Sequence, residues 1–228
     1  MDKLFKFYLT LMFVMLLSCK GKEPVEIYLG IENGHEWVDL GLPSGIKWAT
    51  CNVGASQTAE IGDYFAWGET ITKNEETAYC DSTYIYCDKE GCITKYITYP
   101  TWNIDSIDYK DVLEPSDDAA TINWGGSWRT PTCEEIEELC DNCSWEHIVM
   151  NGVNGCKVTS DINGYSIFLP TAGFKKECYT ENTEYGYYWS SSLNADSFSE
   201  ALALECKNFG GIVRSERYFG FLIRPVCR

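Results

Sequence analysis

Positive charge is scarce in this sequence of 228 residues. Lysine and arginine together number 18 against 34 aspartates and glutamates, which gives a formal net charge of -16. Proteins that bind DNA or RNA use lysine and arginine to neutralise the phosphates, so the sequence predicts no nucleic-acid partner. The apolar content of 45% excludes a disordered chain and indicates a folded domain.

Long hydrophobic runs are missing as well. The apolar run at residues 7–17 would span about 17 Å as a helix, roughly half of a bilayer's hydrocarbon core, so it is too short to cross a membrane. Lys3 and Lys6 precede this run and Ser18 follows it, an arrangement typical of a signal peptide.

The end of that signal peptide resembles a bacterial lipobox. Its last residues are Leu16, Leu17 and Ser18, followed directly by Cys19. We therefore predict a lipoprotein signal peptide at 1–18, lipidation of Cys19, and a lipidated tether at 19–35. The predicted location is the bacterial cell envelope, at the outer membrane, with the membrane as a partner through the lipid. The periplasmic face and the cell surface both remain open, and so does an ordinary cleaved signal peptide.

Cysteine is abundant, with 12 residues, which favours an oxidising compartment. Without Cys19 eleven thiols remain, so at least one has no intramolecular disulfide partner. The sequence predicts disulfides, including a local bridge within Cys80, Cys87 and Cys92. Cys140 and Cys143 form a C-x-x-C pattern, but helical spacing already explains both as apolar-face residues, so no metal site is predicted.

Two helices and several short strands are expected. Ser116 can cap a helix at 117–123, and Thr132 with Glu135 forms a capping box at the start of a second helix. Short strands are predicted at 165–169, 201–206, 211–214 and 218–223, between glycine and asparagine turns. This pattern predicts an α+β fold with small antiparallel sheets and long loops.

A series of sequence blocks then resembles a known family. The blocks are EWVDLGLPSG (36–45), WATCNVG (48–54), GDYFAWGE (62–69), DDAA (117–120), WGGSWRTPT (124–132), DNCSW (141–145), FLPTAG (168–173), GYYWSS (186–191) and RPV (224–226). Together they are similar to the Fibrobacter succinogenes major paralogous domain and cover residues 36–228. The resemblance implies a C-type-lectin-like fold, distantly similar to formylglycine-generating sulfatase-modifying enzymes, in a secreted or lipid-anchored bacterial protein. The family has no generally assigned activity.

The segment at 72–112 departs from the family pattern and is interpreted as a variable insertion. Long loops often carry recognition residues, so ligand binding is predicted here and in the loop at 179–186. The candidate ligand-binding residues are Tyr84, Tyr86, Tyr99, Trp102 and Tyr185.

The enzymes of related fold impose requirements that this sequence does not meet. A formylglycine-generating activity needs a closely spaced cysteine pair near the C-terminus, whereas Cys206 and Cys227 are 21 residues apart. The related iron enzymes use several histidines, and this chain has only His35 and His147. Calcium-dependent lectins resemble one another in a Glu-Pro-Asn or Gln-Pro-Asp loop that is followed by Trp-Asn-Asp. In this chain the nearest fragments are Trp-Asn-Ile-Asp at 102–105 and Glu-Pro-Ser at 114–116, in the reverse order, so calcium-dependent sugar binding is not supported. No catalytic residue and no cofactor are predicted.

The sequence as a whole predicts a lipid-anchored, extracytoplasmic binding or interaction module without catalytic activity. Aromatic loop residues suit either a glycan or a protein ligand. Two alternatives remain: an enzyme descended from the formylglycine-generating fold with a degenerate site, and a structural component of the cell envelope.

Overall fold

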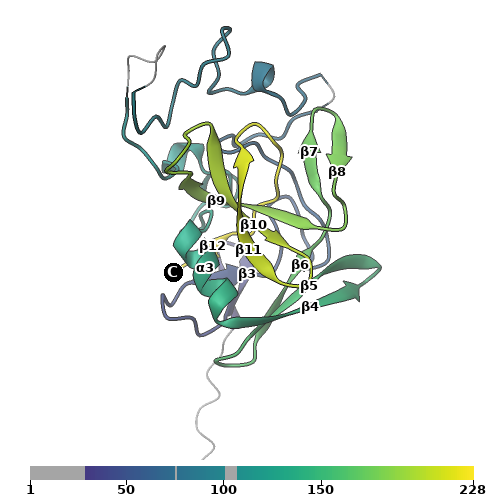
Figure 1. Ribbon diagram of the computed structural model, residues 1–228. Helices are drawn as coiled ribbons and strands as arrows, with labels where there is room; N and C mark the ends of the chain where they lie inside the picture. The colour runs from purple at the N-terminus through teal and green to yellow at the C-terminus, as the bar shows by residue number, and fades with distance from the viewer. Residues whose placement is uncertain (1–28, 75, 101–106) are drawn as a thin grey trace, which may run out of the picture.

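The computed structural model describes residues 29–74, 76–100 and 107–228, which form mostly small antiparallel sheets with few helices, consistent with the predicted α+β class (Figure 1). Two α-helices and four small antiparallel sheets occur in these described ranges. The predicted signal peptide at 1–18, Cys19 and Trp102 lie outside them. None of the described helices is long and apolar enough to cross a membrane.

The sheets contain between two and four strands each. The first has the order β1 (Leu29–Glu32), β2 (His35–Asp39), β3 (Lys47–Ala49) and β12 (Val226–Cys227). A second contains β4 (Cys143–Met150), β5 (Val153–Ser160) and β6 (Ser166–Pro170). The third has β10 (Glu200–Cys206) between β9 (Gly186–Leu193) and β11 (Gly210–Glu216), and the fourth pairs β7 (Phe174–Lys176) with β8 (Tyr179–Glu181).

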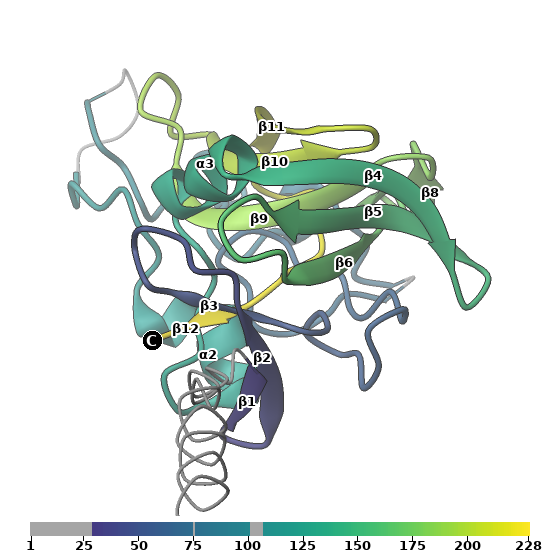
Figure 2. The same ribbon diagram turned by 90° about the horizontal axis from the view of Figure 1, so that it is seen from below.

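The first sheet joins the two ends of the described chain. Val226 of β12 pairs with Trp48 of β3, which in turn pairs with Val38 of β2. Figure 2 shows the β1 and β2 hairpin projecting beside this junction, away from the sheets of β4 to β6 and β9 to β11. Because β12 comes from the other end of the described chain, the first sheet forms only when the two ends of that chain pack together.

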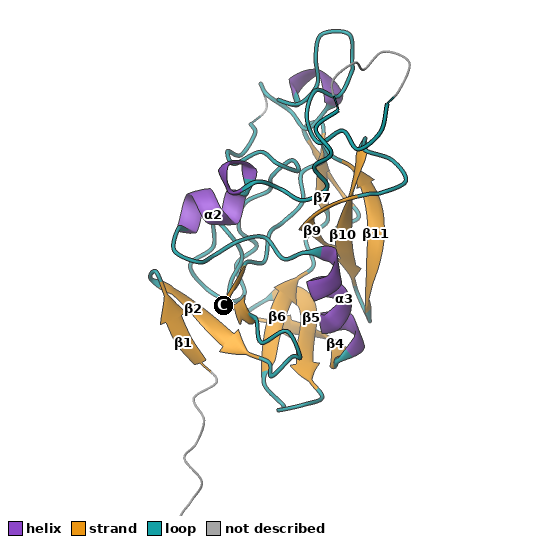
Figure 3. Ribbon diagram, turned by 90° about the vertical axis from the view of Figure 1, so that its left-hand side faces the viewer, coloured by secondary structure: helices purple, strands orange, loops and turns teal. Residues whose placement is uncertain are grey.

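The clearer of the two predicted helices is confirmed. Helix α3 (Cys133–Asp141) starts at Thr132, whose side chain accepts a hydrogen bond from the Glu135 backbone, while the Glu135 carboxylate accepts one from the Thr132 backbone. Its apolar face buries Ile136 and Leu139. In Figure 3 the helix lies beside the strands of the second and third sheets, so its apolar face packs against these two sheets.

The other helix starts two residues later than predicted. Helix α2 (Ala119–Trp124) is capped by Asp118, whose carboxylate accepts hydrogen bonds from the backbones of Ala120 and Thr121. Ser116 was expected to be the cap, but the short 3-10 helix Pro115–Asp117 precedes α2 and includes Ser116. Asp117, predicted as the first residue of the helix, ends this 3-10 helix and forms an ion pair with Lys95.

The strand predicted at 218–223 is not a continuous strand. Its residues bridge to three separate segments: Gly220 to Lys175, Phe221 to Phe65, and Leu222 to Tyr188. Because each partner comes from a different part of the chain, no ladder of regular length forms.

The core is rich in tryptophan, and most of the tryptophans with a described side chain are buried. Trp48, Trp67, Trp128 and Trp189 are each almost completely inaccessible to solvent. Trp67 and Trp189 also donate hydrogen bonds from their indole N–H groups to the carbonyls of Ser190 and Phe65. These bonds join the GDYFAWGE loop to β9, as expected for a buried loop anchored by aromatic residues.

The insertion at 72–112 runs over one end of the molecule, drawn in blue to teal at the top of Figure 1. It contains the 3-10 helix Asp81–Thr83 and otherwise irregular backbone within its described residues. Tyr79, Tyr84, Tyr96 and Ile97 from this segment are buried. The insertion therefore contributes to the hydrophobic core and is not only an external loop.

Cys80, Cys87 and Cys92 are free thiols in the structure. The local bridge predicted within Cys80, Cys87 and Cys92 is therefore not formed. Cys80 has its sulfur beside the hydroxyls of Ser82 and Thr83, at 3.3 and 3.5 Å. These contacts satisfy the thiol without a second cysteine.

Candidate binding groove beside Tyr185

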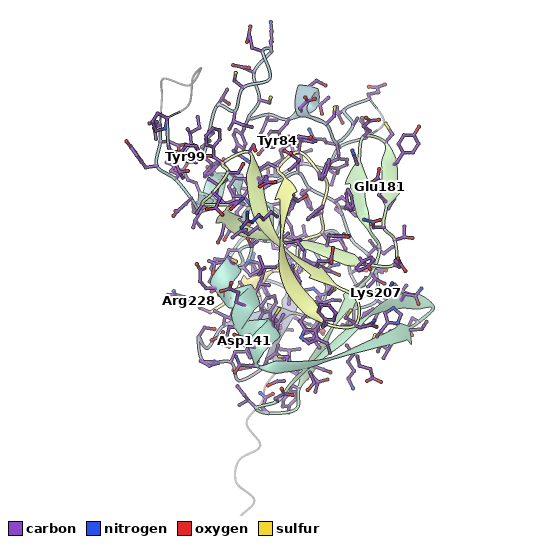
Figure 4. The ribbon with its side chains drawn as sticks, viewed as in Figure 1. Tyr84, Tyr99, Asp141, Glu181, Lys207 and Arg228 are labelled. Atoms are coloured by element: carbon purple, nitrogen blue, oxygen red, sulfur yellow. The ribbon has the colours of Figure 1, made fainter. Side chains whose placement is uncertain are left out.

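The five predicted ligand-binding residues do not form one surface. Tyr99 lies at the top of the view in Figure 4, whereas Lys207, which is close to Tyr185, lies at its lower right. Trp102 is outside the described residues. The aromatic residues of the insertion and the loop at 179–186 therefore cannot contact one small ligand together.

Tyr84 corrects the sequence prediction most clearly. Its side chain is only 2% exposed, so it cannot contact a ligand at the surface. Its hydroxyl donates to the carbonyl of Trp67 at 2.7 Å and accepts from Nε of Arg217 at 2.9 Å. Its burial raises the pKa of the hydroxyl far above the ordinary range. Tyr84 is a structural residue that binds Arg217.

Arg217 is completely buried and lies among aromatic rings. Its guanidinium carbon is 4.7 Å from the ring centre of Trp67, with the rings of Tyr84, Tyr86 and Tyr96 within 6 Å. Nη1 donates to the carbonyls of Lys95 and Phe198, at 3.0 Å each. Cation–π contacts and backbone carbonyls thus stabilise this cation. Half-buried Tyr86 belongs to this cluster, so its contact with Arg217 accounts for an aromatic residue at this position without a ligand.

The Tyr99 side chain remains 37% exposed, but one side of its ring is covered by another residue. Its ring packs against Phe198 with 4.9 Å between the ring centres, and its hydroxyl donates to the Asp196 carbonyl at 3.2 Å. Tyr99 does not line the groove beside Tyr185. Tyr99 therefore connects the insertion to the loop before β10.

Tyr185 is the predicted residue that does line a hollow. A groove of about 400 Å³ lies along the turn between β10 and β11. Its lining residues are Tyr185, Glu205, Lys207, Asn208, Phe209, Gly211, Ile212 and Val213. The two strands supply half of them, and the turn between the strands supplies Lys207, Asn208 and Phe209.

Two aromatic side chains border this groove. Phe209, in the turn after β10, is 75% exposed, which is unusual for a large apolar residue with no covering segment. Tyr185 precedes β9 and is half-buried. Gly210, next to Phe209, lies directly over the Trp145 ring: a Cβ there would be 2.5 Å from that side chain. The turn is thus packed at its base while Phe209 projects into solvent.

The polar groups of the groove are held by neighbouring residues. Nζ of Lys207 lies 2.5 Å from the Glu184 carboxylate and 4.6 Å from the centre of the Tyr185 ring. The hydrogen bond from Lys207 to Glu184 raises the pKa of the lysine. Burial, together with the hydrogen bond to Glu205, raises the pKa of Tyr187 to about 12, so its hydroxyl stays protonated as a donor. These contacts orient Lys207 and Glu205 before any ligand binds.

The histidines and acidic residues do not form a metal centre in the described ranges. No group of three or more His, Cys, Asp or Glu side chains there is placed to hold an ion. His35 stacks on Trp124, with 3.8 Å between ring centres, and His147 is exposed on β4. His35 thus has a packing position and His147 a surface position.

Sequence reasoning missed most of the groove. The loop at 179–186 predicts Tyr185 as a binding residue, whereas Glu205 lies in a predicted strand and Lys207, Asn208 and Phe209 lie in the turn that follows it. One available signal was Phe209 itself, since a large aromatic residue in a polar turn before two glycines has no local packing role.

Comparisons with known proteins add no identity. The chain matches no protein-family model, no curated protein and no solved structure. The function is therefore argued from the groove and from the sequence signals described above.

Proposed function

We propose that this protein is a lipid-anchored binding module of the bacterial cell envelope, with a C-type-lectin-like domain that binds a glycan in the groove beside Tyr185. One observation carries the proposal: a hollow of about 400 Å³ combines two aromatic side chains with the hydrogen-bonding groups of Glu205, Lys207 and Asn208. Sugars present both apolar C–H faces and hydroxyl groups, so their recognition requires this combination.

The dimensions of the groove favour a glycan over a protein ligand. Its volume is at the small end of the range for sites that enclose a small ligand. A stable protein partner would cover roughly 800 Å² on each side, over a broader and flatter area. The net charge of -16 disfavours acidic polysaccharides, because the whole protein would repel them. A neutral glycan fits best.

Membrane attachment in this proposal depends on Cys19. An acidic protein gains no attraction from anionic lipid headgroups, so the acyl chains on Cys19 must provide the affinity. Strands β1 and β2 begin at Leu29 and His35, so the range 19–35 predicted as a tether includes residues of the first sheet.

Glycan binding can be tested on an array of neutral glycans with the purified chain and two variants, Tyr185→Ala and Phe209→Ala. We expect each variant to bind the preferred glycan at least about tenfold more weakly, because truncation of an aromatic anchor typically costs about 2 kcal/mol. The matched control is Tyr179→Ala, which removes an exposed tyrosine outside the groove. Equal loss in all three variants, or no binding by the parent chain, would contradict the proposal.

A further inference from the structure

Gly211 differs from every other glycine in the described part of the chain. Each of the others either has a positive φ or has neighbouring atoms that a Cβ would strike. Gly211 has neither: its φ is not positive, and a Cβ built on it meets no atom within 4 Å beyond its own neighbours in the chain. Neither backbone conformation nor packing therefore requires glycine at this position.

Two other glycines of the same sheet show the contrast. A Cβ at Gly210 would lie 2.5 Å from the Trp145 ring, so packing requires glycine there. A Cβ at Gly186, in β9 on the other side of β10, would lie 2.9 Å from the Cys206 sulfur. The sheet thus contains two glycines that its packing requires and a third, Gly211, whose surroundings are open.

A glycine inside a strand lowers stability. Gly211 is the second residue of β11 and pairs with Glu205 of β10. Glycine loses more conformational freedom on folding than any other residue and offers no side chain to the neighbouring strand, so most residues would stabilise this position. No contact among the described residues compensates for this cost, which leaves the groove as the feature that a side chain here would change.

Gly211 lies within the groove beside Tyr185. Residues directly opposite each other in an antiparallel pair point to the same face of the sheet. Gly211 is opposite Glu205, and Glu205 is opposite Tyr187. Glu205 and Gly211 both line the groove of about 400 Å³, together with Tyr185 and Phe209. A side chain at position 211 would therefore project into the space that we assign to the ligand.

The main chain at Gly211 is also open to a ligand. Strand β11 is the outer strand of its sheet in the described ranges, with β10 on one side only. An outer strand has N–H and C=O groups without a strand partner, and these groups can hydrogen-bond to hydroxyls. Without a side chain at position 211, a ring can approach this main chain closely.

We propose that Gly211 is a specificity-determining residue of the groove: the absence of its side chain lets the pyranose ring of a neutral glycan lie against the main chain of β11, beside Tyr185 and Phe209. The inference rests on the proposed function and adds how the ligand is seated. It also gives a reason for the stability cost of this glycine, because a more stabilising residue would fill the site.

Two substitutions at this position separate binding from folding. We expect Gly211→Val to bind the preferred neutral glycan at least about tenfold more weakly than the parent chain, because its side chain occupies the groove. Its thermal unfolding midpoint should be unchanged or higher by roughly 2 to 4 °C, because valine favours strands. Gly211→Ala should have an intermediate affinity, since it adds a single methyl group. Calorimetric titration and thermal unfolding of the full chain measure both properties.

The control is Arg214→Val, which places the same side chain at an exposed position of β11 outside the groove and should keep the parent's affinity. Parent-like affinity of Gly211→Val would overturn the inference, and so would equal weakening by Arg214→Val. Weaker binding of Gly211→Val together with a midpoint several degrees lower would also overturn it, because Gly211 would then be a structural residue.

The outcomes distinguish this inference from the proposed function. If Tyr185→Ala and Phe209→Ala lose glycan binding while Gly211→Val retains it, the proposed function stands and the inference about Gly211 fails. If the parent chain binds no neutral glycan, both are overturned.

Discussion

At the scale of single residues, Arg217 shows how distant side chains decide the role of a sequence signal. Tyr84 and Tyr86 were expected to face a ligand, because aromatic residues in a long insertion often do so. In the structure they contact a buried arginine instead. The hydrogen bond between Tyr84 and Arg217 joins residues 133 positions apart, so no local pattern could have indicated it.

Asp117 gives a prediction about pH. Burial would raise its pKa, but hydrogen bonds from Lys95, Tyr96 and Tyr86 outweigh this and hold the pKa below its usual value. The ionised carboxylate therefore stabilises the folded state at neutral pH, and this stabilisation is lost as pH falls from about 4 through the folded-state pKa. We expect Asp117→Asn to be less stable than the parent at pH 7, with the difference shrinking below about pH 4. Urea unfolding at several pH values measures this difference in the free energy of unfolding.

The control for this experiment is Asp196→Asn. Asp196 pairs with Arg214 at 3.2 Å, but both side chains are largely exposed. Exposed ion pairs contribute little to stability, so this variant should follow the parent at every pH. A difference for Asp117→Asn that stays constant down to pH 2 would show that its charge is not the cause.

At the scale of elements, helix α3 illustrates what a sequence can predict. Its capping box depends on Thr132 and Glu135, three positions apart, and both hydrogen bonds form as expected. Arg129 adds an ion pair with Glu135 at 2.5 Å, from the turn before the helix. The start of α2 was wrong because Asp117 has a tertiary partner, Lys95, that lies outside the local pattern.

The capping box can be tested by Thr132→Ala. The variant loses the side-chain acceptor for the Glu135 backbone, so we expect the free energy of unfolding to fall by about 1 kcal/mol. Glu137→Ala, at an exposed position of the same helix, should change it by less than about 0.5 kcal/mol. Chemical denaturation of the three proteins provides the comparison, and equal effects in both variants would contradict a capping role.

At the scale of the whole molecule, the insertion at 72–112 is part of the domain. Its buried residues Tyr79, Tyr84 and Tyr96 pack in the core, and Lys95 binds Asp117 just before α2. The main chain also bridges to other segments, from Tyr79 to Glu177 and from Val112 to Ser192. The sequence predicted that the aromatic residues of this segment bind a ligand, whereas Tyr79, Tyr84 and Tyr96 are buried.

This placement predicts how shortening the insertion will act. Removing 73–111 should prevent stable folding, because it deletes core side chains. Replacing only 88–91, an exposed turn between the bridged residues Cys87 and Ile93, with Asn-Gly should change the unfolding temperature by a few degrees at most. Glycan binding should persist in the second variant, since the groove lies elsewhere. Thermal unfolding and the glycan array measure both outcomes, and loss of binding in a folded turn variant would place recognition in the insertion.

The sequence by itself determined that the domain combines small antiparallel sheets with few helices, together with the capped helix α3 and three of the four predicted strands, β6, β10 and β11. These features depend on residues within a few positions of one another, so the local pattern contains the necessary information. The tertiary structure decided which aromatic residues are exposed and where a groove forms. Tyr84 is buried and Tyr185 lines the groove because of partners far away in the sequence. Cys156 and Cys206 belong to one buried cluster because two sheets pack, and packing depends on the whole chain at once.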